Sequence, residues 1–384
     1  MEEIFKKEKE FYIPFFNRLP VVFERGEGCW LFDCNGKKYL DLVAGIACVS
    51  VGYSHPEFIA KVTEQLKKLV HVSNLYYTTP QLDLAEKLKK ITGLSKFFFS
   101  NSGTEAVEGA LKIARKVTGK KKFIALENSF HGRTMGALSV TWKEKFRKPF
   151  EPLISPVEFC KFNDIQDFER KVDEETAAVI IEPIQGESGV YEVNKDFIKA
   201  IFEKREELGF VVIFDEVQTG FGRTGRWFAK EHFGYEPDIM TMAKAMASGI
   251  PMGGIGVKDE IAEKIEFSEH GSTFGGNPLA CSASIATIEI IEKENLVENA
   301  EKVGEYLKKR LEELEFDPRG KGLMLGFDLD GKYKNKAVEI VKECLKKGLI
   351  LNYTSENTIR LVPPLILKKE EVDYAYEILK SVFS

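Results

Sequence analysis

The chain has 384 residues, of which 43% are hydrophobic and 30% are charged, and its formal net charge is −5. This length allows more than one hydrophobic core, so we expect one large and one small domain. The slightly acidic balance, without a basic block, gives no electrostatic reason to expect nucleic acid or an anionic membrane as a partner, which leaves small molecules as the expected ligands.

The beginning of the chain is charged from its second residue onward, so we expect no secretory signal there. The first forty or so residues are expected to form strands and irregular segments. Within them, the pair Asn35-Gly36 separates apolar runs at residues 29–33 and 38–42, a pattern that predicts a β-hairpin.

From about residue 56 the sequence alternates between helical patterns and short apolar strands. Helical periodicity covers residues 57–70, 104–117 and 196–208. The candidate strands are short and rich in apolar residues, and they lie at residues 96–100, 122–127, 177–182, 210–215, 238–243 and 254–257. This alternation predicts an α/β fold in which a mostly parallel sheet carries helices on both faces and binds ligands at the carboxyl ends of its strands.

The last quarter of the chain has a different pattern. A helix is expected at residues 282–292, followed by charged helices and by strands at 323–329 and 358–362. We therefore expect three parts: a large ligand-binding domain at residues 51–284, a smaller α+β domain at residues 285–384, and an N-terminal segment, residues 1–50, that packs with the small domain.

The six cysteines are scattered and form no C-x-x-C motif and no cluster with histidine. They are expected to be reduced thiols of a cytoplasmic protein and not a metal site or a disulfide framework. No apolar stretch approaches the roughly 20 residues that a membrane span requires, so no span is expected.

Two charged residues stand out against apolar surroundings. Lys244 lies within a run of small and apolar residues at 239–249, and Asp215 ends the apolar run 210–214. A lysine in such surroundings tends to lose its proton and become a nucleophile toward carbonyls. A charged group at the end of a core strand is costly to desolvate unless it has a role there. Together the two residues suggest a lysine that binds pyridoxal phosphate covalently and a carboxylate that faces the ring nitrogen. A surface lysine and an unrelated strand-end aspartate remain the alternative.

A possible phosphate site follows the strand at residues 96–100. Ser102 and Glu105 have the S-x-x-E spacing of a helix capping box, and an apolar helical face begins at Ala106. Gly103 lets the backbone approach a ligand closely, and the free N–H groups of a helix start bind anions. An ordinary capped helix is the alternative.

Two further motifs are weak. Residues 220–225 match G-x-G-x-x-G, but no clear helix opens there and no acidic residue ends a second strand about 20 residues later, so a dinucleotide site is disfavoured. Residues 214–216 look like a Walker B strand, but no G-x-x-x-x-G-K-[ST] motif exists in the chain, which excludes a P-loop ATPase.

Six separated motifs resemble those of the class III (ornithine-type) pyridoxal-phosphate-dependent aminotransferases of fold type I. They are NSGTEA at 101–106, SFHGRT at 129–134, IEPIQGE at 181–187, FDEVQ at 214–218, AK at 243–244 and GSTFGGNP at 271–278. Their order and spacing make the resemblance specific, and it extends from about residue 15 to residue 370. It implies the α/β fold already expected, with pyridoxal phosphate as the cofactor and no metal.

The resemblance also implies roles around the cofactor. Lys244 would bind it covalently and move the proton during the reaction, while Asp215 would pair with its ring nitrogen. The remaining cofactor-binding residues would hold the phosphate, the ring face and the phenolic oxygen, and they are Ser102, Gly103, Thr104, Phe130, Glu216, Val217, Gln218 and Thr273. Thr273 would come from a partner subunit, so a homodimer with shared active sites is expected.

For substrates, the resemblance assigns Arg133 and Ser272 to the amino donor and Arg360 to the carboxylate beside the reacting carbon, with Glu187 shielding Arg360 when a side-chain amine reacts. Guanidinium groups suit these carboxylates because they bind them in bidentate fashion. His131 is assigned no chemistry.

Within this family, the compact length and residues 131–134 and 358–364 look most like enzymes that transfer the δ-amino group of N2-acetylornithine to 2-oxoglutarate, giving N-acetylglutamate 5-semialdehyde and glutamate, in arginine biosynthesis. Succinylornithine, ornithine, a lysine-biosynthesis intermediate and 4-aminobutyrate remain alternative donors. The segment 48–53 lies near the expected far end of the donor and does not decide among them. A nicotinamide oxidoreductase and a non-catalytic phosphate binder are the alternatives from other classes.

Overall fold

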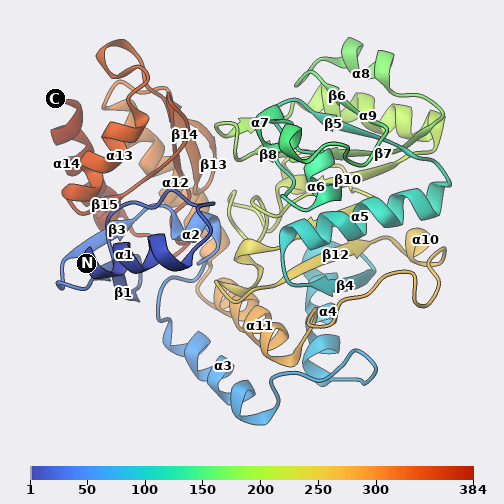
Figure 1. Cartoon of the computed structure of the whole chain (residues 1–384), viewed down its shortest axis with the longest axis horizontal. Coiled ribbons are helices and arrows are strands. Elements are labelled where there is room, and N and C mark those ends of the chain that lie inside the picture. Colours follow the sequence, from blue (N-terminus) through green and yellow to red (C-terminus); the bar gives the residue numbers. More distant parts are fainter. Residues whose placement is uncertain (1) are drawn as a thin grey trace.

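The computed structural model describes residues 2–384, and its largest element is a seven-stranded sheet (Figure 1). In spatial order the strands are β4 (Lys96–Ser100), β12 (Gly253–Val257), β11 (Ile239–Met242), β10 (Val211–Asp215), β7 (Thr176–Ile181), β5 (Lys122–Leu126) and β6 (Val157–Cys160). Only β12 runs against its two neighbours, since the other pairings are parallel. The predicted α/β fold with a mostly parallel sheet is confirmed.

Helices cover both faces of this sheet because its strands are apolar on both sides. On one face, Ile213 of β10 packs in a cluster with residues of α5 (Gly103–Thr118). On the other, Phe214 packs with residues of α8 (Ile165–Lys171) and α9 (Lys195–Leu208). Neighbouring residues of a strand point to opposite faces, so both clusters draw on the same short strand.

The two ends of the chain share a second sheet. Its strands are β1 (Phe23–Glu27), β2 (Trp30–Asp33), β3 (Lys38–Asp41) and β15 (Leu349–Ile350). Strands β2 and β3 form the hairpin predicted from Asn35-Gly36, and Leu40 of β3 pairs with Leu349 of β15 in parallel. The N-terminal strands therefore extend the C-terminal part of the fold, as Figure 1 shows at the left.

A four-stranded antiparallel sheet completes that part, in the order β13 (Arg319–Lys321), β14 (Met324–Asp328), β17 (Thr358–Leu361) and β16 (Asn352–Ser355). It is accompanied by α12 (Leu296–Glu312), α13 (Ala337–Lys346) and α14 (Lys369–Phe383). The other longer helices are α3 (Pro56–Lys68), α4 (Thr79–Thr92) and α11 (Pro278–Lys293). The short elements are α2 (Ala44–Ala47), α6 (Met135–Ser139), α7 (Glu144–Arg147), α10 (Asp259–Ala262), β8 (Ile184–Gln185), β9 (Tyr191–Glu192), η1 (Lys148–Phe150), η2 (Ala229–His232), η3 (Lys244–Ala247) and η4 (Gly331–Tyr333).

Some predictions were wrong or incomplete. The N-terminal region was expected to lack helices, but it begins with α1 (Glu2–Phe11), which buries none of its residues. Strand β6 was not foreseen. The domain boundaries at residues 50 and 284 stay a prediction, and residue 284 falls inside α11. Among residues 2–384, none of the helices combines the length and the apolar character that a membrane crossing needs.

The segment between β3 and α3 contains a left-handed turn. Residues Ala44 to Ala47 have φ values of 51°, 62°, 65° and 61°, a region that side chains disfavour. The Asp41 carboxylate holds the start of the turn by accepting the N–H groups of Val43 at 2.7 Å and Ala44 at 3.0 Å. The turn leads directly into Cys48.

The glycine-rich run 220–225 forms turns, and no helix begins within it. Gly222 and Gly225 have φ values of 88° and 80°, which glycine adopts without strain. Between them, the fully buried guanidinium of Arg223 donates to the carbonyl oxygens of Leu323 at 2.9 Å and Pro363 at 2.5 Å. The run therefore ties the large sheet to the C-terminal strands and lacks the helix start of a dinucleotide site.

Candidate active site

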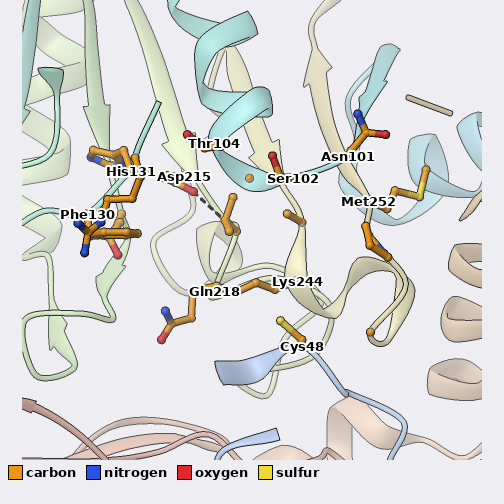
Figure 2. A pocket seen from close by; sticks show the side chains of 18 of the residues that line it. Cys48, Asn101, Ser102, Thr104, Phe130, His131, Asp215, Gln218, Lys244 and Met252 are labelled. Carbon is orange, nitrogen blue, oxygen red and sulfur yellow. Dashed lines mark hydrogen bonds and ion pairs between the residues drawn. The ribbon is translucent and has the colours of Figure 1, made fainter. Parts of the chain in front are cut away.

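A cavity of about 470 Å³ lies at the carboxyl ends of the central parallel strands. Both residues of the predicted central pair, Lys244 and Asp215, line it (Figure 2). They come from separate strand ends, because Asp215 is the last residue of β10 and Lys244 follows β11. The parallel pairing of β10 with β11 brings these two ends together.

Lys244 is partly buried and has the properties of a nucleophile. Burial lowers the pKa of its amine, the Glu187 carboxylate opposes that change, and the Arg360 guanidinium adds to it. A lowered pKa increases the fraction of neutral amine that can attack a carbonyl. The backbone of Lys244 has a φ of 44°, and such strained conformations are found preferentially at functional sites.

Asp215 is 4% exposed and is held by three donors. Its Oδ1 accepts the N–H of Val217 and the hydroxyl of Thr241, each at 3.1 Å, and its Oδ2 is 2.7 Å from Nδ1 of His131. These bonds fix the orientation of the carboxylate in the cavity wall. A carboxylate so fixed can stabilise a proton on a basic nitrogen that approaches it.

The start of α5 provides an anion site in the same wall. The Ser102 hydroxyl accepts the N–H of Glu105 at 3.3 Å, so Ser102 caps the helix as predicted. The Glu105 carboxylate accepts the N–H of Asn101 at 2.7 Å and not that of Ser102, so the second half of the predicted capping box does not form. First-turn N–H groups such as those of Gly103 and Thr104 have no partner within the helix and can bind a phosphate. A Cβ at Gly103 would lie 2.8 Å from Cγ1 of Val217, so the close packing here requires glycine.

An ion pair between a buried arginine and a partly buried glutamate lies beside the cavity. Arg360 of β17 is fully buried, and its Nη1 lies 2.6 Å from Oε1 of Glu187. The same nitrogen donates to Oε1 of Gln218 at 3.0 Å, and Gln218 is part of the cavity wall. Although burial acts in the opposite direction, Arg360 and Lys244 lower the pKa of Glu187 to about 2. The carboxylate is therefore ionised throughout the ordinary pH range.

The structure brings most of the predicted residues together. The cavity wall contains Ser102, Gly103, Thr104, Phe130, Arg133, Asp215, Val217, Gln218 and Lys244. Ser272 lies next to the wall, because its hydroxyl accepts from Asn101 Nδ2 at 3.4 Å, whereas Thr273 is exposed on the surface. Arg133 lies over the ring of Phe146, with its guanidinium carbon 3.5 Å from the ring centroid.

Glu216 is the predicted residue whose side chain is directed elsewhere. Its carboxylate is fully buried and accepts the N–H groups of Ala229 at 2.9 Å and Lys230 at 2.7 Å, as well as the Thr219 hydroxyl. It therefore satisfies the start of η2 and is absent from the cavity wall. The expectation that Glu216 helps to hold the cofactor receives no support from its side chain.

Two titratable residues of the wall, His131 and Glu182, were given no role from the sequence. Glu182 carries the same signal as Asp215, since it is an acid that directly follows an apolar strand. His131 carries no such signal, because its bond to Asp215 joins positions 84 residues apart.

The groups of the wall fit pyridoxal phosphate. A helix start with hydroxyls suits a phosphate, a fixed carboxylate suits a basic ring nitrogen, and a lysine of lowered pKa suits an aldehyde. Phe130 adds an aromatic surface for a ring. Among residues 2–384, no group of three or more His, Cys, Asp or Glu side chains could hold a metal ion.

Comparisons with known proteins agree with this site. The sequence model of the family described as "Aminotransferase class-III" matches residues 15–383. An acetylornithine aminotransferase of Archaeoglobus fulgidus is 60% identical over 97% of this chain and 98% of its own length. One of Aquifex aeolicus is 46% identical over 96% of this chain and 98% of its own.

Solved structures of related proteins have the same fold. An aminotransferase of Bacillus anthracis superposes with a TM-score of 0.94 at 32% identity, covering 100% of this chain and 98% of its own. The ornithine aminotransferase of Toxoplasma gondii ME49 has a TM-score of 0.94 at 28% identity, covering 100% of this chain and 94% of its own.

Proposed function

This chain belongs to the class-III aminotransferases, and we propose that its reaction is the transfer of the δ-amino group of N2-acetylornithine to 2-oxoglutarate, giving N-acetylglutamate 5-semialdehyde and glutamate. The chain is a pyridoxal-phosphate-dependent aminotransferase, whose substrates are amino acids and 2-oxoacids. The choice of donor is carried by the 60% identity to a relative named acetylornithine aminotransferase over nearly the full length of both chains.

We assign the cofactor-binding roles as follows. Lys244 Nζ binds the cofactor covalently and afterwards moves the proton at the carbon that carries the reacting amino group. Asp215 holds a proton on the ring nitrogen, and its bond to His131 keeps the carboxylate in place. When bound, pyridoxal phosphate supplies a ring that accepts electrons from the reacting carbon.

The other assignments follow from positions in the wall. Phe130 and Val217 would contact the ring, and Gln218 would donate to the phenolic oxygen. Ser102, Gly103 and Thr104 hold the phosphate through the start of α5. These assignments are supported by the shared cavity and by the donors that it offers.

Substrate selection rests on two arginines. Arg133, together with Ser272, would bind the carboxylate of the amino donor. Arg360 would bind the carboxylate next to the keto group of 2-oxoglutarate, once Glu187 has moved aside. The reacting end of acetylornithine has no such carboxylate, so Arg360 stays neutralised by Glu187 while that substrate is bound.

We also propose a homodimer. Phe274, which follows Thr273, is 59% exposed, and the apolar residues Leu75 and Tyr77 are 84% and 95% exposed. Asn74 joins these two segments by donating to the carbonyl oxygens of Ser272 and Gly275, each at 3.0 Å. Exposed apolar patches of this kind mark interfaces, and a second copy would cover the patch and bring its Thr273 to the phosphate. A cytoplasmic location is proposed as well, and the six free cysteines support it.

A complementation experiment tests the shared site. Thr273→Asp places a negative charge beside the phosphate of the neighbouring site, and Lys244→Ala removes the nucleophile, so each variant alone should be inactive. Mixed dimers have one site with both native residues, and refolding the two variants together should restore roughly a quarter of the wild-type activity. The measurement is the steady-state rate of the mixture. An inactive mixture that contains mixed dimers by native mass spectrometry would refute the shared site.

Replacing Glu187 by alanine is expected to change specificity more than rate. Without its partner, Arg360 is free to bind the α-carboxylate of any amino acid, so glutamate should become a better amino donor relative to acetylornithine. The kcat/KM for acetylornithine divided by the kcat/KM for glutamate should fall by about tenfold or more, because Arg360 gains a charge-assisted bond to the α-carboxylate of glutamate. Glu301→Ala, which removes a comparable pair with Arg226 on the surface, serves as the control and should leave the ratio unchanged.

The donor itself is tested by initial rates with acetylornithine, succinylornithine, ornithine and 4-aminobutyrate, each with 2-oxoglutarate. Acetylornithine is expected to have the highest kcat/KM. If free ornithine exceeds it, the proposed donor is wrong although the aminotransferase chemistry stands.

A further inference from the structure

Glu182 is a buried acid of the cavity wall that the reaction described above does not use. It directly follows β7 and is 5% exposed. The register pairs Ile181 of β7 with Phe214 of β10, so Glu182 and Asp215 follow paired positions at the carboxyl ends of neighbouring strands. The wall thus contains two acids side by side, of which only Asp215 has an assigned role.

Each oxygen of the Glu182 carboxylate accepts a backbone N–H from a different loop. Oε1 accepts from Phe130 at 2.9 Å, and Oε2 accepts from Gly186 at 3.1 Å. The first loop follows β5 and the second follows β8. One carboxylate therefore joins two segments that are more than fifty positions apart in the sequence.

Both loops carry other parts of the site. The Phe130 ring lines the cavity, and the next residue, His131, holds Asp215 (Figure 2). On the other side, the Gly186 carbonyl accepts from Arg360 Nη1 at 3.1 Å. A Cβ at Gly186 would lie 2.4 Å from Oε1 of Gln218, so Gln218 packs directly on this peptide.

We propose that Glu182 is a positioning residue that sets, through these two hydrogen bonds, both the aromatic wall at Phe130 and the ion pair of Glu187 with Arg360. The inference deepens the proposed function, and its kinetic part rests on that function. Its structural part, the fixing of two loops by one acid, does not.

The electrostatic surroundings are consistent with this role. Burial raises the pKa of Glu182 to about 7, with Asp215 adding to the rise and His131 opposing it. The titratable groups that face it are His131 from the loop after β5, Asp215 from β10 and Lys244 from η3. A buried acid with a perturbed pKa in a cavity wall is typical of functional sites.

Glu182→Gln tests the role with little change in size. A carboxylate accepts both N–H groups, but an amide has one acceptor oxygen and one NH2 donor, so one of the two bonds must be lost. The matched control is Asp238→Asn. Asp238 is also buried and accepts a backbone N–H, from Val212 at 2.8 Å. It directly precedes β11, so it lies at the amino end of that strand, whereas the cavity lies at the carboxyl ends.

The direct readout is hydrogen exchange of the backbone amides of Phe130 and Gly186 in the cofactor-free protein. We expect one or both amides to exchange at least about tenfold faster in Glu182→Gln than in Asp238→Asn. In the loaded enzyme, Glu182→Gln should lower kcat/KM for both half-reactions by about tenfold or more, whereas Asp238→Asn should leave the values per folded molecule unchanged. Glu182→Asp keeps the carboxylate on a shorter stem and should give intermediate values in both assays, and it replaces Glu182→Gln if that variant does not fold.

Exchange rates of the two amides that match those of Asp238→Asn would overturn the inference. If acetylornithine is not the best of the four donors but the two amides exchange faster in Glu182→Gln, only the proposed donor is refuted. If acetylornithine is the best donor but the two amides exchange in Glu182→Gln as they do in Asp238→Asn, only the role of Glu182 is refuted.

Discussion

Replacing Lys244 by arginine is expected to lower kcat by at least about 10³-fold, because the reaction loses both its covalent attachment point and its proton carrier. A guanidinium does not lose its proton in proteins, so it can neither attack an aldehyde nor accept a proton. The positive charge is retained, which separates loss of chemistry from loss of electrostatics. Two measurements check the result: the steady-state rate, and the mass of the protein after borohydride reduction, which should increase by the mass of the cofactor in the wild type but not in Lys244→Arg.

Lys145→Arg is the matched control, since it makes the same chemical change at an exposed position of α7. It should keep wild-type activity and the borohydride adduct. A Lys244→Arg variant that stays within about tenfold of the wild-type rate would refute the assignment of the nucleophile.

Asp215→Asn should give the second largest effect, a fall in kcat of about 10² to 10³-fold. The neutral amide cannot hold a proton on the ring nitrogen, so negative charge on the reacting carbon is no longer stabilised. It also replaces a charged acceptor for His131 by a neutral one. Single-turnover absorbance changes with each substrate should slow in both half-reactions, because both pass through the same charged carbon.

Asp173→Asn provides the comparison for this variant, since Asp173 is a surface acid paired with Lys122 at 2.6 Å. Its rates should match the wild type. Equal losses in the two variants would mean that the effect of Asp215→Asn comes from stability and not from its position at the ring nitrogen.

Much of the fold was predictable because its central strands are buried on both faces and therefore appear in the sequence as continuous apolar runs. Strand β6 lacks that signal, since it is four residues long and contains Glu158. Helix α1 buries none of its residues, so its sequence lacks the apolar stripe from which a helix is predicted. The direction of β12 depends on how the chain returns after η3, which no local pattern encodes.

The site was predictable where a charged residue stands among apolar neighbours in the sequence, as Lys244 and Asp215 do. Residues whose role depends on a partner were harder to find. His131 becomes informative only through its bond to Asp215, and Glu182 only through the two loops that it joins. Glu216 was assigned to the cofactor because it directly follows Asp215 in the sequence. Its carboxylate instead accepts the N–H groups at the start of η2.

The left-handed turn at residues 44–47 holds conformational strain directly before Cys48, a residue of the cavity wall. Such a backbone costs roughly 1–2 kcal/mol for each residue other than glycine, and a β-branched side chain fits it worst. Ile46 is β-branched and 41% exposed, so it combines the highest conformational cost with little packing to lose. An unbranched residue at this position would therefore relax the main chain beside the cavity wall. The turn is thus a place where thermal tolerance can be raised without replacing a residue of the cavity wall.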